Sequence, residues 1–369
     1  MDLIQVVPGI PPKVNGIGDY AYKLARRLRD GHGIKTTFLV ADSNWQTEEH
    51  EEFPTSRIEK RTPESFLDAV DGLSFGATSG PKHMLVQFSP YGYQKRGCPN
   101  WLINGLEELH KRGIGALHAA FHELEVHSMR PWSSTFWVPG IQRSLIKRLA
   151  RISQFRYTNT EEYRGHLEGW GVGRIDLIPN FSAMDEPQEY PLFDGREPNI
   201  VIFGRGAQRK WTYDHASGTL GKLCRQLGIT RIIDIGQPLS GSPLLEIDGI
   251  PIHHCGRLPE EEVNAWMSSS IATFMYYPVP LLTKSSVHAA SCATGTIPFI
   301  VDENTKELSC PSLITGEDFV AVPKDYSHLK VRNLADISRN AFDNYRGRTS
   351  RQAAAHIARN LADCEQKAR

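Results

Sequence analysis

The chain has 369 residues, of which 42 are Lys or Arg and 42 are Asp or Glu, so its formal net charge is zero. Such a length favours two domains over one. The balanced charge excludes a net electrostatic field that would attract nucleic acid, so we expect no nucleic-acid partner and only local anion sites. The six cysteines are scattered without a CxxC pair, which favours reduced thiols in a cytoplasmic protein over a disulfide framework or a zinc knuckle.

The first half of the chain alternates strands and helices. Continuous apolar runs predict buried strands at 3–7, 36–41, 84–88 and 114–121. The first run follows Met1 directly, without the basic flank and longer apolar run of a signal peptide, and no segment approaches the roughly 20 apolar residues that span a bilayer. Apolar residues at helical spacing predict amphipathic helices at 17–28, 101–110 and 141–152.

The periodicity disappears after Ser182, where proline and acidic residues predominate up to Pro198. We therefore expect a linker at 183–198 between an N-terminal domain at 1–182 and a C-terminal domain at 199–349, followed by a helix at 350–369 that can pack back on the N-terminal domain. Strands at 199–203, 231–236, 271–277 and 297–301 again alternate with helices. The fold class is thus predicted as α/β, with two facing Rossmann-like parallel-sheet domains and a cleft at the carboxyl ends of the strands.

Two glycines, Gly16 and Gly18, stand where the first strand gives way to the first helix. Glycines there let the backbone approach a ligand and leave the helix N-terminal amides free for an anion or a sugar hydroxyl. A tight strand-to-helix turn is the alternative. The glycines are too few and too close together for the dinucleotide fingerprint.

A polar cluster, His122 and Glu123, follows the strand at 114–121, where an α/β cleft recruits its chemistry. Glu125 and His127 fit a solvated loop better. His122 and His127 stand five positions apart, which places them on different faces of a helix, so we reject zinc binding and expect no metal site.

Three cations follow the first strand of the second domain in a glycine-flanked turn. Gly204, Arg205, Arg209 and Lys210 are predicted to hold a diphosphate, because point charges and bidentate guanidinium contacts suit phosphate oxygens. A basic surface loop is the alternative.

The segment Thr283, Lys284, Ser285 and Ser286 opens a later helix. Helix N-terminal amides, hydroxyls and a lysine predict a second phosphate cradle. An N-cap serine is compatible with this interpretation.

Taken in order, these motifs resemble those of a GT-B glycosyltransferase, most similar to the retaining family 4. Pro8–Tyr20 resembles that family's opening glycine loop, Arg174–Asn180 the end of its acceptor domain, and Gly204-Arg205 with Lys210 the pair of cations that grips the donor diphosphate. Cys255–Pro259 and Ala290–Val301 follow the family's later pattern. The family usually carries two glutamates eight positions apart, one for the transferred sugar and one for the nucleotide ribose. The matching positions here are Pro280 and His288, and by its position His288 is a candidate substrate-binding residue.

The resemblance implies transfer of a hexose from a nucleoside diphosphate sugar, with UDP or GDP as the nucleotide, to the hydroxyl of a glycan, a lipid-linked molecule or a small molecule. It implies retention of anomeric configuration without a metal or another cofactor, with Arg205 and Lys210 stabilising the departing diphosphate and His122 near the transferred sugar. An inverting reaction would need a base, for which Glu123 is the nearest candidate. Because both glutamates are replaced, a noncatalytic nucleotide-sugar or phosphate-binding protein of the same fold is the alternative.

The helix at 141–152 is basic and follows Trp132 and Trp137. It could rest on an anionic membrane and meet a lipid-linked acceptor, which would make the protein peripheral to the membrane. A solvated basic face is the alternative. The basic residues are Arg143, Lys147, Arg148 and Arg151.

Overall fold

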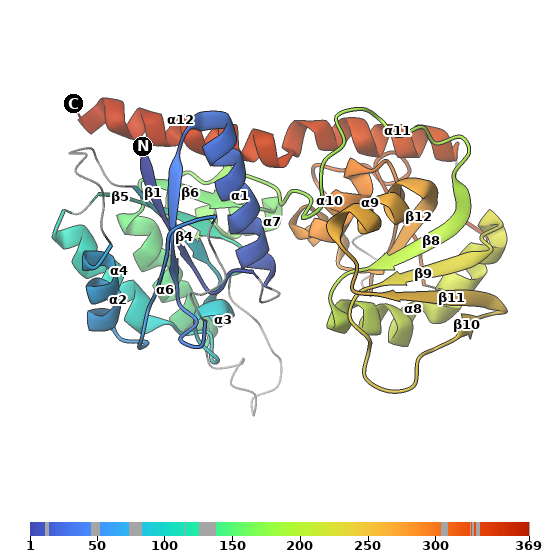
Figure 1. Cartoon of the computed structure of the whole chain (residues 1–369), viewed down its shortest axis with the longest axis horizontal. Coiled ribbons are helices and arrows are strands. Elements are labelled where there is room, and N and C mark those ends of the chain that lie inside the picture. Colours follow the sequence, from blue (N-terminus) through green and yellow to red (C-terminus); the bar gives the residue numbers. More distant parts are fainter. Residues whose placement is uncertain are drawn as a thin grey trace. The chain divides into compact units, whose positions relative to one another are not determined.

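The chain forms two compact α/β units, shown in a computed structural model (Figure 1). Unit 1 comprises Met1–Pro179 and Ser350–Arg369, and unit 2 comprises Asn180–Thr349. The structure describes residues 1–11, 15–45, 52–73, 83–113, 115–124, 138–303, 309–324, 326, 328–329 and 333–368.

Unit 1 is built on a seven-stranded sheet in the order β3-β2-β1-β4-β5-β6-β7, in which every pair is parallel. Its strands are β1 (Asp2–Val7), β2 (Lys35–Val40), β3 (Thr55–Arg57), β4 (His83–Phe88), β5 (Ala116–Phe121), β6 (Phe155–Thr158) and β7 (Asp176–Leu177). Its helices are α1 (Gly16–His32), α2 (Pro63–Asp71), α3 (Pro90–Tyr93), α4 (Asn100–Lys111), α6 (Pro139–Ile152), α7 (Glu161–Gly169) and α12 (Ser350–Ala368).

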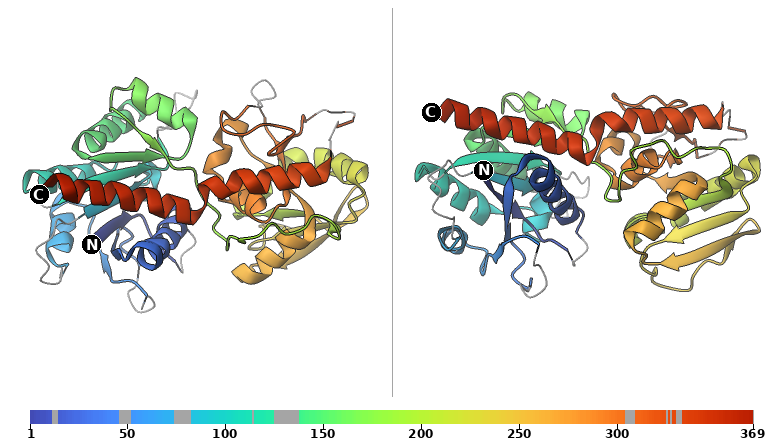
Figure 2. Two further views of the ribbon diagram at one scale, coloured as in Figure 1. Left: turned by 90° about the horizontal axis from the view of Figure 1, so that it is seen from above. Right: turned by 45° about the horizontal axis from the view of Figure 1, so that its top comes forward.

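The two faces of this sheet differ in chemistry. Side chains alternate between the faces of a strand, and one face buries an apolar core against α2, α4 and α6. The opposite face carries buried polar side chains from three neighbouring strands, where α1 and α12 run side by side (Figure 2). We call this set the polar layer; it consists of Gln5, His83, Gln87 and His118.

Unit 2 is built on a second seven-stranded sheet in the order β10-β11-β9-β8-β12-β13-β14, in which only β10 and β11 pair antiparallel. Its strands are β8 (Glu197–Phe203), β9 (Arg231–Ile235), β10 (Glu246–Ile247), β11 (Ile250–Gly256), β12 (Ser270–Tyr276), β13 (Ile297–Val301) and β14 (Val320–Ala321). Its helices are α8 (Gly206–Leu227), α9 (Glu260–Ser269), α10 (Ser286–Ala293) and α11 (Leu334–Tyr345), with 3-10 turns η2 (Val279–Lys284) and η3 (Arg346–Arg348). The prediction of two Rossmann-like parallel-sheet domains is confirmed.

Residues 183–198, expected as a linker, lie in unit 2 and are hydrogen-bonded to it. Glu186 accepts a hydrogen bond of 2.5 Å from the Tyr345 hydroxyl. Arg196 donates to the carbonyl oxygens of Ser270, Thr294 and Gly295 at 2.9 to 3.2 Å.

Each sheet reverses its strand order beside its own first strand. In unit 1, β2 and β3 lie on one side of β1 and β4 lies on the other; in unit 2, β9 and β12 flank β8 in the same way. Ligands of open α/β sheets bind in the crevice outside the carboxyl ends of the strands at such a switch point. The fold therefore marks the loops after β1 and β4, and those after β8 and β12, as candidate sites.

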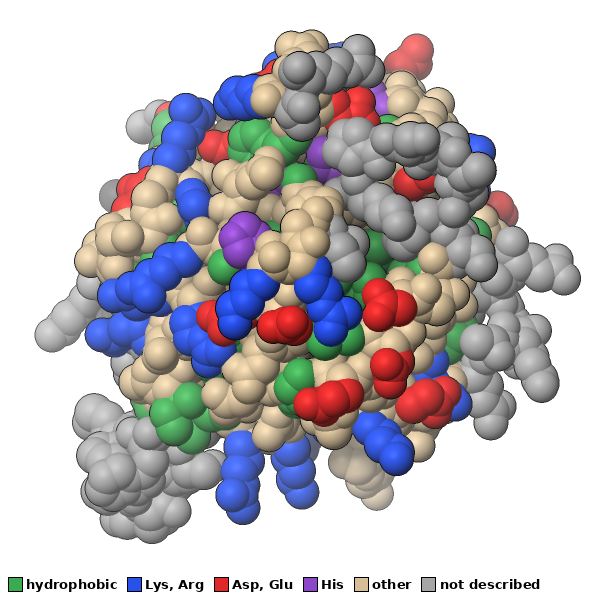
Figure 3. Space-filling model, turned by 90° about the vertical axis from the view of Figure 1, so that its left-hand side faces the viewer, with side chains coloured by type: hydrophobic (Ala, Val, Ile, Leu, Met, Phe, Trp, Pro, Cys, Tyr) green, Lys and Arg blue, Asp and Glu red, His purple; other side chains and the backbone are tan. Residues whose placement is uncertain are grey.

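Charges of both signs occur on one face of the molecule. On the face drawn in Figure 3, Lys and Arg side chains intermingle with Asp and Glu side chains. This mixture agrees with the formal net charge of zero.

Candidate functional site

The loops after β8 and β12 are in contact at the switch point of unit 2. Gly204 follows β8 with φ of +132°, a conformation that L side chains rarely adopt. A Cβ atom there would lie 3.2 Å from Cγ2 of Val287 in the first turn of α10. Glycine at this position therefore lets the β8 loop and the start of α10 approach closely.

The N-terminus of α8 is well suited to an anion. Arg205 is the N-cap residue in an extended conformation, no side chain caps the first amides, and the first turn contains no acidic residue. A long helix that begins in this way presents unpaired N–H groups and the positive end of its dipole. The Arg205 side chain is exposed at the same point.

Gln208 adds a donor that the sequence did not suggest. It lies in the first turn of α8, close to Gly204. Its Nε2 atom is buried and has no hydrogen-bond partner within the described part of the chain. Buried amide donors are normally hydrogen-bonded, and a phosphate or ribose oxygen is an acceptor that could bind this one.

Arg209 corrects the sequence prediction, because its guanidinium is not available to a diphosphate. It donates to both carboxylate oxygens of Asp234 at 2.7 and 2.9 Å and to the Gln237 carbonyl at 2.8 Å. The Arg209 and Asp234 side chains are 3% and 0% exposed. His254 Nδ1 also lies 2.8 Å from Asp234 Oδ2. Arg205 is the extended residue before the helix, whereas Arg209 lies within the helix with its side chain turned inward, so Arg209 holds α8 to β9.

Lys210 remains on the surface of α8. Its ammonium pairs with Asp214 one turn later at 2.7 Å, and both side chains are about half exposed. Exposed pairs of this spacing contribute about 0.3–0.5 kcal/mol, so a phosphate group could displace Asp214 at little cost.

The segment before α10 is held in place by backbone hydrogen bonds. Asn180 donates from its backbone and its side chain to the carbonyl oxygens of Thr283 and Lys284, both at 2.8 Å. Ser285 caps α10 by accepting from the His288 amide at 3.1 Å. Thr283 and Ser285 are buried, Lys284 is half-buried and Ser286 is exposed, so Lys284 and Ser286 are the members of this predicted cradle that reach the surface.

His288 also needs a correction, because its ring lies inside unit 2. The residue is 0% exposed, and its Nε2 atom lies 3.5 Å from Cys292 Sγ one turn further along α10. Burial, together with the neighbouring charge of Arg348, holds the pKa of His288 well below its usual value. A neutral, enclosed imidazole does not contact a nucleotide ribose at the surface.

In unit 1, the glycine turn is a tight capped helix start. The Asn15 side chain accepts hydrogen bonds from the amides of Ile17 and Gly18 at 3.1 and 3.3 Å, so these two amides are not free as we expected. A Cβ atom on Gly18 would lie 2.1 Å from the Gly9 carbonyl oxygen. Close helix packing thus explains Gly18, and Gly16 is the first residue of α1.

His122 lies at the carboxyl end of β5 and is linked to the polar layer. Its Nε2 atom is 2.7 Å from Gln87 Oε1, Gln87 Nε2 donates to Gln5 Oε1 at 2.7 Å, and Gln5 Nε2 donates to the Ala21 carbonyl at 3.4 Å. The Ala21 carbonyl oxygen can only accept, so Gln5 and then Gln87 must each donate from Nε2 and accept at Oε1. His122 Nε2 is therefore the donor to Gln87 Oε1.

Two further contacts complete this group. The Tyr20 ring meets the His122 ring edge-on with centroids 4.9 Å apart. Glu123 Oε2 accepts from the Ser89 hydroxyl at 2.5 Å, which joins the ends of β4 and β5. His122 and Glu123 thus lie at the carboxyl edge of the unit 1 sheet, whereas Glu125 and His127 fall outside the described residues.

The basic face of α6 is partly occupied within unit 1. Arg148 donates to both carboxylate oxygens of Glu107 at 2.7 and 2.9 Å, and the Arg143 guanidinium lies 4.9 Å from the centre of the Trp170 ring. Trp132 and Trp137 fall outside the described residues. Among the described helices, none combines the length and the apolar character needed to cross a membrane.

Comparison with known proteins identifies the fold. No family model matches the chain, and no curated protein matches its sequence. Solved structures do match: the pneumococcal O-GlcNAc transferase GtfA in complex with UDP and GlcNAc has a TM-score of 0.60 at 9% identity, covering 98% of this chain and 99% of that one. TarM matches with a TM-score of 0.59 at 8% identity, covering 98% of both chains. Sucrose-phosphate synthase from Thermosynechococcus elongatus matches with a TM-score of 0.57 at 15% identity, covering 98% and 94%. The chain therefore shares the GT-B fold of these glycosyltransferases.

Proposed function

We propose that this protein transfers a hexose from a nucleoside diphosphate sugar to a hydroxyl acceptor, with retention of configuration and without a metal ion. The observation that carries the proposal is the anion-binding geometry at the switch point of unit 2. There, the uncapped start of α8, the exposed Arg205 and the unpartnered Gln208 amide occur together in one turn.

The chemistry assigned to this turn is stabilisation of the leaving group. When the bond between the sugar and the diphosphate breaks, negative charge grows on the diphosphate oxygens. The first amides of α8 and the Arg205 guanidinium would hold that charge, with Lys210 joining after it leaves Asp214. Lys284 and Ser286 at the start of α10 would bind the remaining phosphate oxygens.

In unit 1, we assign His122 to the transferred sugar and Glu123 to the acceptor side. The hydrogen bonds through Gln87 and Gln5 orient the His122 ring at the carboxyl end of β5, where it would contact a sugar hydroxyl. If the acceptor attacks from the face that the diphosphate leaves, leaving-group stabilisation matters more than a protein base. The acceptor is assigned only as a hydroxyl compound, which includes a lipid-linked one at a membrane surface.

A noncatalytic nucleotide-sugar or phosphate-binding protein is the second candidate. It is favoured by Pro280 and His288 at the positions of the family's two glutamates, since the His288 ring is enclosed and cannot replace a carboxylate. The anion-binding turn of α8 would serve such a protein equally well.

Calorimetric titration with UDP, GDP and ADP tests the donor site in the wild type and in Arg205→Ala and Lys210→Ala. We expect one nucleotide to bind and its affinity to fall by more than about tenfold in Arg205→Ala, a loss of about 1.4 kcal/mol. Lys222→Ala, which removes an exposed cation from a later turn of α8, serves as the matched control. Absence of binding of every diphosphate by folded protein would refute the donor site.

Turnover separates the two candidates. Incubation with the sugar form of the nucleotide that binds, followed by detection of released nucleotide in the presence of mixed hydroxyl acceptors, is expected to show transfer that Arg205→Ala abolishes. Tight nucleotide binding without release over many hours would favour the noncatalytic protein.

A further inference from the structure

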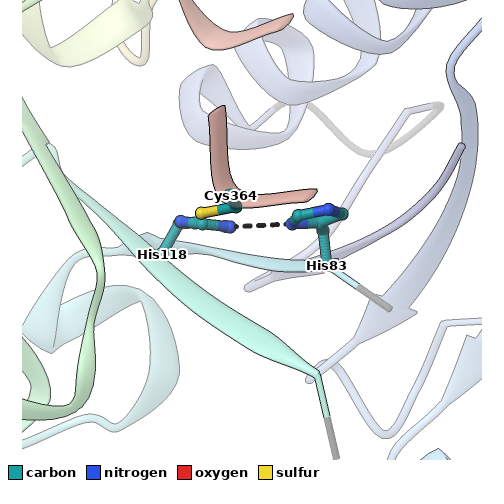
Figure 4. A group of neighbouring side chains, drawn as sticks. All are labelled: His83, His118 and Cys364. Carbon is teal, nitrogen blue, oxygen red and sulfur yellow. Dashed lines mark hydrogen bonds between the residues drawn. The ribbon is translucent and has the colours of Figure 1, made fainter. Parts of the chain in front are cut away.

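Three potential metal ligands converge beneath the C-terminal helix of unit 1. His83 is the first residue of β4 and His118 lies on β5, and both belong to the polar layer. Cys364 of α12 packs against them (Figure 4). His83 Nδ1 lies 3.2 Å from His118 Nε2, and one ligand atom from each of the three residues lies within 4.8 Å of the others. All three residues are buried.

We propose that His83, His118 and Cys364 bind a divalent transition metal of the zinc type. Zinc takes imidazole nitrogens at about 2.0–2.1 Å and thiolate sulfur at about 2.3 Å in tetrahedral sites, which places two such nitrogens about 3.3 Å apart. The observed nitrogen separation of 3.2 Å fits that geometry. Imidazole and thiolate ligands favour zinc or cobalt over the hard cations magnesium and calcium.

Binding of a metal by this cluster requires two neutral imidazoles and a thiolate. The Cys364 thiol is therefore the group that must lose a proton. Binding of the cation would replace the thiol proton with a sulfur–metal bond and release that proton to solvent.

Neighbouring groups provide an outer shell. Glu365 Oε1 lies 3.9 Å from His83 Nε2, the ring nitrogen that faces away from His118. A carboxylate at this place would orient the ring and balance the charge that remains after one thiolate has bound a divalent ion. Gln154 Oε1 accepts a hydrogen bond from the Cys364 thiol at 2.6 Å, and loss of the thiol proton would free this oxygen to serve as the fourth ligand.

The alternative is a histidine pair joined by one N–H···N hydrogen bond. In that arrangement, one ring would direct an unprotonated outer nitrogen into the interior. Neither outer nitrogen, His83 Nε2 or His118 Nδ1, has a hydrogen-bond partner within the described part of the chain. A metal between the inner nitrogens lets both outer nitrogens carry protons, and His83 then points its N–H toward Glu365. A hydrogen bond from His118 Nε2 to His83 Nδ1 would leave the same N–H toward Glu365, so the contacts of His83 suit both arrangements. The convergence of a third ligand group, the Cys364 thiol, on the two rings favours the metal.

The site would fasten α12 to the sheet and take no part in sugar transfer. His83 begins β4, whereas Ser89 and the candidate transfer residues follow the carboxyl ends of β4 and β5. The metal is thus structural, and its binding is measurable without any assay of activity.

Titration of chelator-treated protein with Co²⁺ tests the proposal. We expect one ion per chain, a sulfur-to-cobalt charge-transfer band, intense tetrahedral d–d bands and a higher melting temperature. Cys364→Ser is expected to lose the charge-transfer band and to weaken binding by more than about 100-fold, since even outer-shell partners contribute about 10–100-fold. Elemental analysis of the wild type purified with Zn²⁺ should give one zinc per chain.

Cys98→Ser is the matched control, because Cys98 is another free thiol of unit 1 and contributes to no candidate cluster among the described residues. It should retain the charge-transfer band. Wild-type protein that shows no charge-transfer band with excess Co²⁺ would overturn the proposal, whether or not the variants fold. Retention of the band in Cys364→Ser, or its loss in Cys98→Ser, would also overturn it.

Discussion

Replacement of Arg209 by alanine should destabilise unit 2 without removing the diphosphate site. The substitution leaves the carboxylate of Asp234, whose side chain is 0% exposed, without its guanidinium partner and with the His254 ring 2.8 Å away. Breaking a buried ion pair by removing one partner costs about 3–5 kcal/mol. Unit 2 spans Asn180–Thr349, and for a unit of that size each kcal/mol lowers the melting temperature by about 2–4 °C. We therefore expect the unit 2 transition to fall by about 6–20 °C.

Differential scanning calorimetry and nucleotide titration test this prediction together. Arg205→Ala, four residues earlier, is the matched control and should change stability by less than about 0.5 kcal/mol while it weakens diphosphate binding. Arg209→Met combined with Asp234→Asn should recover most of the lost stability, because no buried charge is then left unpaired. If Arg209→Ala melts like the wild type and binds diphosphate more than tenfold more weakly, the structural role of Arg209 is refuted.

Three other predictions follow from contacts described above. Gly18→Ala should destabilise unit 1 by about 1–3 kcal/mol, because its Cβ atom would lie 2.1 Å from a backbone carbonyl oxygen. A Cβ atom on Gly31 in the same helix would meet nothing within 4 Å, so Gly31→Ala should stabilise unit 1 by about 0.4–1 kcal/mol. Urea unfolding of both variants measures the difference. His288 stays neutral in the folded state, so below pH 6.5 the unfolded chain binds a proton that the folded chain does not. The free energy of unfolding should therefore fall by up to about 1.4 kcal/mol per pH unit. His288→Gln should flatten the plot of unfolding free energy against pH between pH 6.5 and 5, and an unchanged slope would contradict the assignment. Gln87→Leu removes the acceptor of His122 Nε2 and should lower the transfer rate by about tenfold with nucleotide affinity unchanged, while an equal loss of nucleotide affinity would point to misfolding instead.

The sequence predicted the fold well because each element has a strong local signal. The apolar run at 84–88 matches β4 (His83–Phe88), and the helix predicted at 101–110 matches α4 (Asn100–Lys111). Alternation of such elements leaves few topologies other than a parallel sheet. Within the first helix, Leu24 and Leu28 of the apolar stripe are buried as predicted, whereas Ile17 and Tyr20 are half-buried. The small residues Gly18, Ala21 and Ala25 complete the packed face.

The sites were harder to predict, because they depend on side-chain direction and on contacts between distant residues. Arg205 and Arg209 look equivalent in the sequence, yet Arg205 is the exposed, extended N-cap residue and Arg209 is a buried residue within the helix. A polar residue within an apolar strand, such as Gln87, was the available signal for the hydrogen-bond chain that reaches His122. Cys364 lies 246 positions after His118, so no local spacing could have indicated the cluster beneath α12.

The discontinuity of unit 1 affects the order in which the protein folds during synthesis. Unit 2 is one continuous segment, whereas unit 1 needs Ser350–Arg369, which the ribosome makes after all of unit 2. Until that segment emerges, the face of α1 that α12 covers stays open to solvent, together with His83 and His118. Nascent chains usually complete their N-terminal domain first. Here the N-terminal unit cannot be completed until its last helix has been made, after the whole of unit 2.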